Sequence, residues 1–238
     1  MTREEIIKFL VLRSIGNFLL LFAIFGVFAT FGPALYYETQ YRIANARGVR
    51  YTISEPKPPN PKPSSPAIIP LPTITFGDIL VGSTEQVLIP IDTNFSILIP
   101  KIGANARVFP NIDSGNSNEF LPFLQAGVAH AKGTVFPGFQ GNTYLFAHSA
   151  DNFWNVGRYN AVFYLLKDLT VGDDVVIFFE SQRFNYKVSE VRVVDAEDVS
   201  FLVKSQEREE EILILQTCWP PGTTWKRLVV FAKPQLAR

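Results

Sequence analysis

The stretch EEILILQTCWPPGTTWKRLVVFAK, residues 210–233, decides the fold of this chain. It contains two short aliphatic runs, residues 212–215 and 228–231, and runs of this length and composition are typical of buried β-strands. The Pro-Pro-Gly sequence at 220–222 cannot continue either strand, because proline lacks a backbone N–H and glycine favours turns. The stretch therefore predicts two strands on neighbouring elements, joined by one loop.

Two chemically distinctive residues border that loop. Cys218 is the chain's only cysteine and follows the first run, and Arg227 opens the second run nine residues later. A thiol at the end of one strand and a guanidinium at the start of the next would combine a candidate nucleophile with a fixed positive charge. The alternatives are a small buried side chain for Cys218 and an ordinary charge at a strand edge for Arg227.

Length and composition limit the classes of function. The chain has 238 residues, which is enough for one sizeable domain with accessory segments. Lys and Arg total 22, as do Asp and Glu, and no basic run is interleaved with aromatic residues. Nucleic-acid binding is therefore excluded at this stage. A single cysteine also excludes an intramolecular disulfide.

An uncharged segment near the N-terminus predicts a membrane span. Residues 14–37 carry no charge, and a helix of that length would measure about 36 Å, enough to cross a hydrocarbon core of about 30 Å. The alternative is a cleaved signal peptide, for which Ala44-Asn45-Ala46 offers a small-x-small site. The apolar region is longer than such peptides require and the site lies far beyond its end, so a retained anchor is preferred.

A proline-rich segment follows the predicted span. Residues 56–72 contain eight prolines, a composition that favours polyproline II over helix or sheet. The predicted organisation is a cytoplasmic N-terminus at 1–13, a transmembrane helix at 14–37, a linker at 38–73 and a folded domain at 74–238. The linker is expected to act as a semi-rigid spacer.

The folded domain shows short apolar runs separated by turn residues. We predict a hairpin from residues 87–91 and 96–102 around Asp92-Thr93-Asn94, and a second hairpin from 175–179 and 184–194. Further strands are expected at 127–131 and 143–147, with a glycine-rich loop between them, and a short helical segment at 160–169. This spacing predicts a mostly β barrel or sandwich.

The chain has two histidines, His130 and His148. His148 ends an apolar run and precedes a polar turn, so it is placed at a strand end as Cys218 is. Two strand ends can meet on one rim of a barrel although these residues are 70 positions apart. Cys218, His148 and Arg227 would then supply a nucleophile, a general acid or base, and a clamp for an oxyanion or substrate. A lone histidine at a strand end is otherwise an ordinary surface residue.

The local sequence around these three residues resembles the sortase family of cysteine transpeptidases. ILILQTC at 212–218 is similar to the family's TLxTC-type strand, and Arg227 followed by LVVFA is similar to its R-[LI]-V-V strand. GNTYLFAHSA at 141–150 resembles the block that carries the family's histidine, with Ala147 where glycine is common. Matching blocks occur in order at 96–103, 127–138 and 166–176, so the resemblance covers about residues 96–233.

The resemblance implies an eight-stranded sortase-type β-barrel with short helices and a reaction without a cofactor. Cys218 would attack the carbonyl after threonine in an LPxTG-like sorting signal and form a thioester. His148 would serve as the acid and base, and Arg227 would bind the substrate backbone or the oxyanion. Because unperturbed thiols and imidazoles are mostly neutral at pH 7, modest turnover is expected.

The resemblance also implies partners and a location. The substrates would be secreted proteins with C-terminal sorting signals, and the acceptor an amine of a cell-wall precursor or a protein lysine. The catalytic domain would face outward on a single-pass anchor in the cell membrane. The chain ends five residues after Lys233, without a second apolar segment, which favours a role other than pilus polymerisation.

Several neighbouring residues have other candidate roles. Thr217, Trp219 and His130 are candidate substrate contacts, and for His130 a structural role is preferred, with lining of the substrate groove as the alternative. Trp219 and Trp225 could equally wall the groove or pack as core or lid. The acidic residues have no spacing typical of a calcium loop, so no metal is predicted.

Two other classes of function remain open at this stage. The L,D-transpeptidases also use cysteine and histidine, but their arginine follows the cysteine almost at once, unlike the nine-residue interval here. A membrane-anchored β-barrel adaptor with a buried cysteine is the non-enzymatic alternative.

Overall fold

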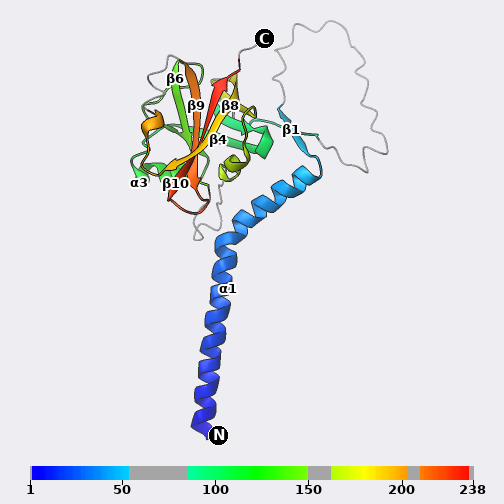
Figure 1. Cartoon of the computed structure of the whole chain (residues 1–238), viewed down its shortest axis with the longest axis vertical. Coiled ribbons are helices and arrows are strands. Elements are labelled where there is room, and N and C mark those ends of the chain that lie inside the picture. Colours follow the sequence, from blue (N-terminus) through cyan, green and yellow to red (C-terminus); the bar gives the residue numbers. More distant parts are fainter. Residues whose placement is uncertain (1, 54–84, 150–161, 203–209, 236–238) are drawn as a thin grey trace, which may run out of the picture.

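A computed structural model of the chain describes residues 2–53, 85–149, 162–202 and 210–235. A long N-terminal helix leads to a β-barrel (Figure 1). The elements in chain order are α1 (Arg3–Ala46), β1 (Arg50–Ile53), β2 (Glu85–Leu88), β3 (Phe95–Ile99), the 3-10 helix η1 (Pro100–Ile102), β4 (Ala104–Ile112), α3 (Ser117–Leu124), β5 (Val128–Ala131), β6 (Gly141–Phe146), the 3-10 helix η3 (Tyr164–Asp168), β7 (Asp174–Phe179), β8 (Gln182–Asp195), β9 (Glu211–Trp219) and β10 (Lys226–Pro234).

Eight of the strands close into one barrel in the order β10-β8-β7-β3-β4-β5-β6-β9. Two neighbouring pairs, β4 with β5 and β6 with β9, are parallel, and the other pairs are antiparallel. The predicted mostly β fold with an eight-stranded barrel is confirmed. The predicted hairpin of residues 175–179 and 184–194 is also confirmed, as β7 and β8.

The strand directions define two ends of the barrel. Strands β3, β6, β8 and β9 finish at the end where β4, β5, β7 and β10 begin. We call this the lower end, because it lies toward the descending part of α1 in Figure 1. The connection between β9 and β10, the helix η3 and the turn before β7 all lie there, whereas β10 runs upward toward the C-terminus.

The central strands read as continuous apolar runs because both of their faces are covered. In β9, Leu213 and Leu215 belong to the cluster that fills the barrel, with relative exposures of 0%. Their neighbours Ile212 and Ile214 point to the opposite face and join a second cluster that α3 and Phe201 cover. Burial on two sides accounts for the loss of the polar alternation that a half-exposed strand would show.

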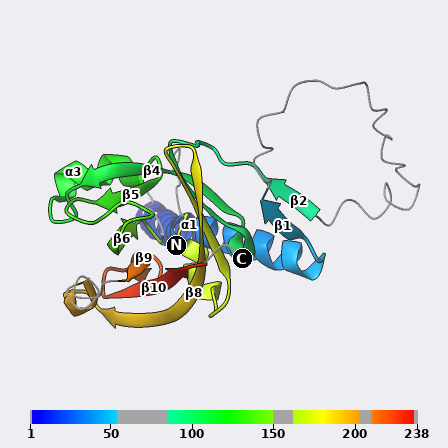
Figure 2. The same cartoon turned by 90° about the horizontal axis from the view of Figure 1, so that it is seen from above.

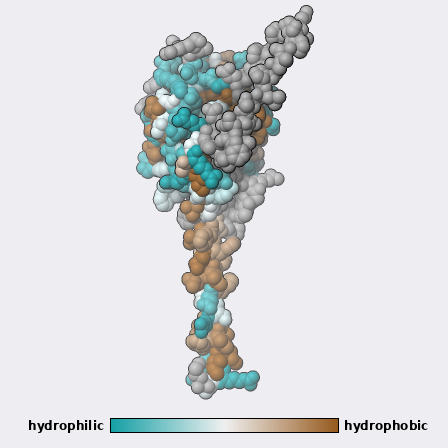
Figure 3. Space-filling view, turned by 90° about the vertical axis from the view of Figure 1, so that its right-hand side faces the viewer, coloured by the Kyte–Doolittle hydropathy of each residue, from teal (hydrophilic) through white to brown (hydrophobic). Residues whose placement is uncertain are grey.

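Helix α1 is longer than the predicted span. Thr2 caps its N-terminus, since the Thr2 side chain accepts a hydrogen bond from the Glu5 backbone N–H and the Glu5 carboxylate accepts one in return. Its most apolar stretch, Arg3–Ala29, is long enough to cross a membrane, and the rest of the protein covers none of it. Figure 3 shows this surface as mainly hydrophobic. The helix bends before it reaches β1 (Figure 1).

The N-terminal part of the predicted linker is folded. Residues 38–46 continue α1, and residues 50–53 form β1, which pairs in parallel with β2. Ile53 and Leu88, one from each strand, pack against Leu98, Val176 and Phe178 on the outside of the barrel. The prediction that a linker begins at residue 38 is therefore corrected, and residues 54–73 lie outside the described part of the chain.

The first predicted hairpin is wrong. The turn at Asp92-Thr93-Asn94 does form, and the Asn94 backbone N–H donates a hydrogen bond to the Asp92 side chain. The strand after it, β3, pairs with β4 and β7, however, while β2 pairs with β1. Val87 and Ile89 are exposed, whereas Leu88 between them packs against the outside of the barrel. Within the predicted helical segment at 160–169, residues 164–168 form the 3-10 helix η3, and residues 160 and 161 lie outside the described part of the chain.

Candidate active site

Cys218 and Arg227 lie directly opposite each other on adjacent strands. Antiparallel pairing aligns β9 with β10 so that Arg227 faces Cys218 and Leu228 faces Thr217. Directly opposed residues project to the same face of a sheet, with Cβ atoms about 4.5–5.5 Å apart. The nine-residue interval in the sequence thus becomes a cross-strand pair at the lower end of the barrel.

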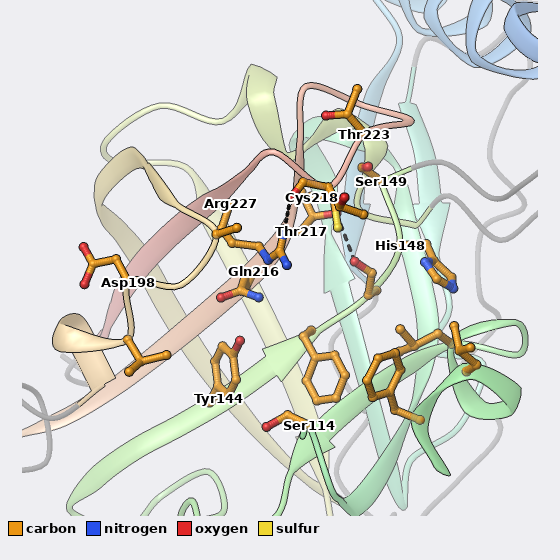
Figure 4. A pocket seen from close by; sticks show the side chains of 18 of the residues that line it. Ser114, Tyr144, His148, Ser149, Asp198, Gln216, Thr217, Cys218, Thr223 and Arg227 are labelled. Carbon is orange, nitrogen blue, oxygen red and sulfur yellow. Dashed lines mark hydrogen bonds between the residues drawn. The ribbon is translucent and has the colours of Figure 1, made fainter. Parts of the chain in front are cut away.

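His148 is brought to the same place by the parallel strand β6. The register matches each residue of β6 with the residue 70 positions later in β9, ending with Phe146 opposite Gln216. The pairing continues past the strand end, because the Ala147 N–H donates to the Gln216 carbonyl over 3.2 Å. Continued by one more residue, this register sets His148 beside Cys218. In Figure 4, Cys218 lies between Arg227 on one side and His148 on the other.

The three residues line one pocket of about 480 Å³. Apolar side chains of α3 (Phe120, Leu121 and Leu124) form part of its wall, and residues 196–202, which follow β8, contribute another part. The sequence prediction that Cys218, His148 and Arg227 occupy one rim agrees with this arrangement. Cys218 and His148 are both half-buried, so they remain accessible from the pocket.

Arg227 is held by the loop that precedes it. Its Nη1 donates hydrogen bonds to the carbonyl oxygens of Thr224, over 3.0 Å, and of Lys226, over 3.1 Å. Both contacts fix the guanidinium to the backbone of its own hairpin. The hairpin connection therefore determines where the positive charge lies relative to the sulfur of Cys218.

Several polar residues of the pocket were not identified from the sequence, among them Tyr144 and Gln216. Tyr144 on β6 and Gln216 on β9 share a face with His148 and Cys218, because residues two apart on a strand point the same way. Burial raises the pKa of Tyr144 above its ordinary value, so its phenol stays neutral, and its hydroxyl is hydrogen-bonded to Gln216. The alternation along 144, 146 and 148 and along 214, 216 and 218 was the available signal.

The predicted substrate-contact residues differ in whether they line the pocket. Thr217 lines the pocket and is buried, and its Oγ1 donates a 2.9 Å hydrogen bond to the carbonyl of Ala147. Trp219 packs against the barrel core and does not line the described pocket. Trp225 is 74% exposed and is also absent from the lining residues. Core packing is therefore incorrect for Trp225, and a place on the groove wall or in a lid stays a prediction.

His130 is not placed to contact substrate, which corrects that candidate role. Its side chain is fully buried and stacks on Phe136, with ring centroids 4.6 Å apart. Its Nδ1 accepts a hydrogen bond from the Asn111 backbone N–H, so the neutral ring carries its proton on Nε2, which faces the Val135 carbonyl at 3.1 Å. The alternative structural role fits this position.

The acidic residues considered for calcium have structural partners. Asp92 pairs with Arg107 at 2.9 Å, Asp174 pairs with Lys187 at 2.7 Å, and Asp173 accepts a hydrogen bond from the Thr170 N–H. Among the described residues, no group of three or more candidate ligands could hold a metal ion.

A closed barrel with a thiol, an imidazole and a guanidinium at one end has the features of a barrel enzyme with a nucleophilic cysteine. The family model described as the Sortase domain matches residues 97–235, more than half of the chain. The chain therefore belongs to the sortase family.

Individual relatives agree with this assignment. The chain is 28% identical over 138 residues to Sortase D of Bacillus subtilis, a match that covers 57% of this chain and 60% of that protein. It resembles in fold a lid mutant of Sortase A from Corynebacterium diphtheriae, with a TM-score of 0.51, 24% identity, and coverage of 62% and 72% of the two chains. It is similar also to sortase C-1 from Actinomyces oris, with a TM-score of 0.51, 25% identity, and coverage of 62% and 77%.

Proposed function

We propose that this protein is a membrane-anchored cysteine transpeptidase that cleaves an LPxTG-like sorting signal and transfers the acyl group to an amine. The observation that carries the proposal is the cross-strand pairing of Cys218 with Arg227, next to the continued register that sets His148 beside Cys218. Membership of the sortase family supports the same chemistry.

The first half of the reaction forms a thioester. The Cys218 thiolate attacks the carbonyl carbon after the threonine, and the carbonyl oxygen becomes an oxyanion. The C–N bond to glycine then breaks, and His148, as an imidazolium, gives its proton to the departing amine. Both hydrogen bonds of Arg227 to described residues come from Nη1. Nε and Nη2 therefore remain as donors for the oxyanion or the substrate backbone.

The second half transfers the acyl group. An incoming amine attacks the thioester carbonyl and gives a proton to the neutral His148. The C–S bond breaks, the new amide leaves, and the thiolate of Cys218 and the imidazolium of His148 are restored. Each half-reaction therefore returns what the other uses, and no cofactor is required.

The pocket suits the apolar part of such a signal. Phe120, Leu121 and Leu124 lie on one wall, and Val199 and Leu202 lie on another. Apolar walls with a small number of polar groups are typical of sites that bury peptide side chains. Leucine and proline of the signal would contact these walls while the threonine carbonyl lies at Cys218.

The anchor proposal rests on α1. Its stretch Arg3–Ala29 is apolar and uncovered, and a surface of this kind costs free energy in water and is stable in a bilayer. We propose that α1 is retained as a single span in the cell membrane, with the barrel on the outer side.

The test uses the full chain in detergent and a library of sorting peptides. Intact-mass measurement should detect an acyl adduct that is absent in Cys218→Ala, and triglycine should convert the adduct to a ligated peptide. His148→Ala should nearly abolish the adduct, since the leaving amine would receive no proton. If no peptide forms an adduct and the thiol reacts no faster than a buried one, the non-catalytic adaptor is the correct alternative.

A further inference from the structure

The C-terminal part of α1 is attached to the barrel. Lys167 in η3 reaches the Glu38 carboxylate over 2.8 Å and the Asp168 carboxylate over 3.0 Å. The Lys167 and Glu38 side chains are only 20% and 18% exposed, so this ion pair is partly shielded from water. The hydrogen bond from Lys167 lowers the pKa of Glu38 below its ordinary value. Tyr41, nearly one turn further along α1, packs against the core of the barrel.

This attachment leaves little distance between the membrane span and the barrel. The apolar stretch Arg3–Ala29 ends nine residues before Glu38, which is about 13 Å along a helix. Figure 1 shows the straight apolar part of α1 ending at the bend just below the barrel, and Figure 2 shows it nearly end-on beneath the barrel. The attachment through α1 therefore sets the height of the barrel above the span, and β1 and β2 pair with each other beside it.

The lower end of the barrel also presents exposed apolar side chains. Trp225, in the connection between β9 and β10, is 74% exposed, and Val171, in the turn before β7, is 71% exposed. Both segments lie at the end that carries Cys218, as the strand directions require. Tryptophan is enriched at the boundary between lipid and water, because its ring is apolar and its indole N–H is polar.

We propose that the lower end of the barrel rests on the outer surface of the membrane that holds α1, with Trp225 and Val171 in contact with lipid. The Glu38–Lys167 pair maintains this orientation. The pocket then lies close to the membrane surface. This inference depends on the membrane span proposed above.

Spin labels on single cysteines test the contact. Cys218 is the chain's only cysteine, so Cys218→Ser provides a background without thiols for Trp225→Cys, Val171→Cys and Phe139→Cys. Phe139 is the matched control, because it is 63% exposed in the loop between β5 and β6 at the upper end. Phe22→Cys reports on the span itself. Each labelled full-length chain is reconstituted in lipid nanodiscs and exposed to oxygen or to a water-soluble nickel chelate.

Oxygen concentrates in lipid, so the labels at 225, 171 and 22 should be more accessible to oxygen than to the nickel chelate. The label at 139 should be more accessible to the nickel chelate than to oxygen. If the label at 22 is lipid-exposed but those at 225 and 171 behave like the one at 139, the orientation is overturned while the anchor stands. If the label at 22 is in water, the membrane span itself is wrong.

Charge reversal tests the role of the ion pair. Lys167→Glu should shift the labels at 225 and 171 toward nickel accessibility, because two carboxylates would then repel each other. Adding Glu38→Lys should restore the lipid contact. Lys233→Glu is the control, because Lys233 pairs with Glu210 over 2.8 Å at the upper end. Unchanged label accessibility in Lys167→Glu would contradict the orienting role of this pair.

Discussion

Thr217 donates a hydrogen bond of 2.9 Å to the carbonyl oxygen of Ala147. This bond joins the residue before Cys218 to the residue before His148, at the point where the regular pairing of β6 and β9 has ended. Thr217 is 3% exposed, so the bond is formed away from water. It therefore extends the register by which the thiol and the imidazole are brought together.

Replacing Thr217 by valine should weaken this alignment. Valine preserves the shape but leaves the buried Ala147 carbonyl without its donor, at a cost of about 1–3 kcal/mol. We expect Thr217→Val to lower the free energy of unfolding by that amount and to slow thioester formation, whereas Thr217→Ser should keep most of both. Denaturant unfolding measures the change in stability, and quenched time points of adduct formation measure the change in rate. Equal rates for the valine and serine variants would show that the hydroxyl does not align the site.

Arg227→Lys should lose activity although it keeps the positive charge. An ammonium cannot reproduce a planar guanidinium that donates to Thr224 and Lys226 from Nη1 and offers Nε and Nη2 to a substrate. Removal of one oxyanion donor typically costs about 100-fold or more in rate. The rate of adduct formation at saturating peptide measures the loss. A full rate in Arg227→Lys would contradict the proposed clamp, and Lys226→Arg, on the neighbouring exposed position, is the control.

The buried His130 predicts a pH-dependent stability. Burial lowers the pKa of His130 below its ordinary value of 6.5. Below pH 6.5 the unfolded chain binds a proton at this residue while the folded chain does not, so the free energy of unfolding falls as the pH decreases toward the folded pKa. Above pH 6.5 both states are neutral and this contribution is fully present.

The comparison of His130→Gln with the unchanged protein isolates this effect. Glutamine does not titrate, so the unfolding free energy of the variant should depend less on pH between 7.5 and 5, by at most about 1.4 kcal/mol per pH unit. The variant should be less stable at pH 7.5, because the contacts with Asn111 and Val135 are disturbed. Identical slopes for both proteins would rule out His130 as the titrating group. Some catalytic activity should remain, since His130 does not line the pocket.

The barrel and the positions of the candidate site residues could be predicted because they depend on local signals. The runs around Cys218 and Arg227 are continuous and end at proline and glycine, which fix the strand ends. His148 also ends an apolar run, so all three residues had assigned positions on strands. The likeness to sortase sequence blocks then identified which ends meet, and the register of β6 with β9 agrees with it.

The errors arose where pairing is not local. The turn at residues 92–94 has the side-chain chemistry of a hairpin, yet β3 pairs with β7, whose residues lie about 80 positions later. Nothing within residues 87–102 encodes that partner. The attachment of Glu38 to Lys167 spans 129 positions and likewise depends on the closed barrel. The choice between the two roles of His130 could not be made from the sequence, because a strand shows which residues alternate but not which face a closed barrel encloses.

Asn142 holds the part of the pocket wall that Leu202 forms, and its replacement should affect substrate binding more than catalysis. It is 2% exposed, and its Nδ2 donates a 3.0 Å hydrogen bond to the carbonyl of Leu202, which lines the pocket. Asn142→Ala should release that part of the wall. The peptide concentration needed for half-maximal adduct formation should rise several-fold, which corresponds to a loss of about 1–2 kcal/mol in binding free energy. The rate at saturation should change little. Asn105→Ala is the control, because Asn105 makes a similar bond to the Ile89 carbonyl far from the pocket. An equal change in both variants would show that lost stability, and not the wall, is responsible.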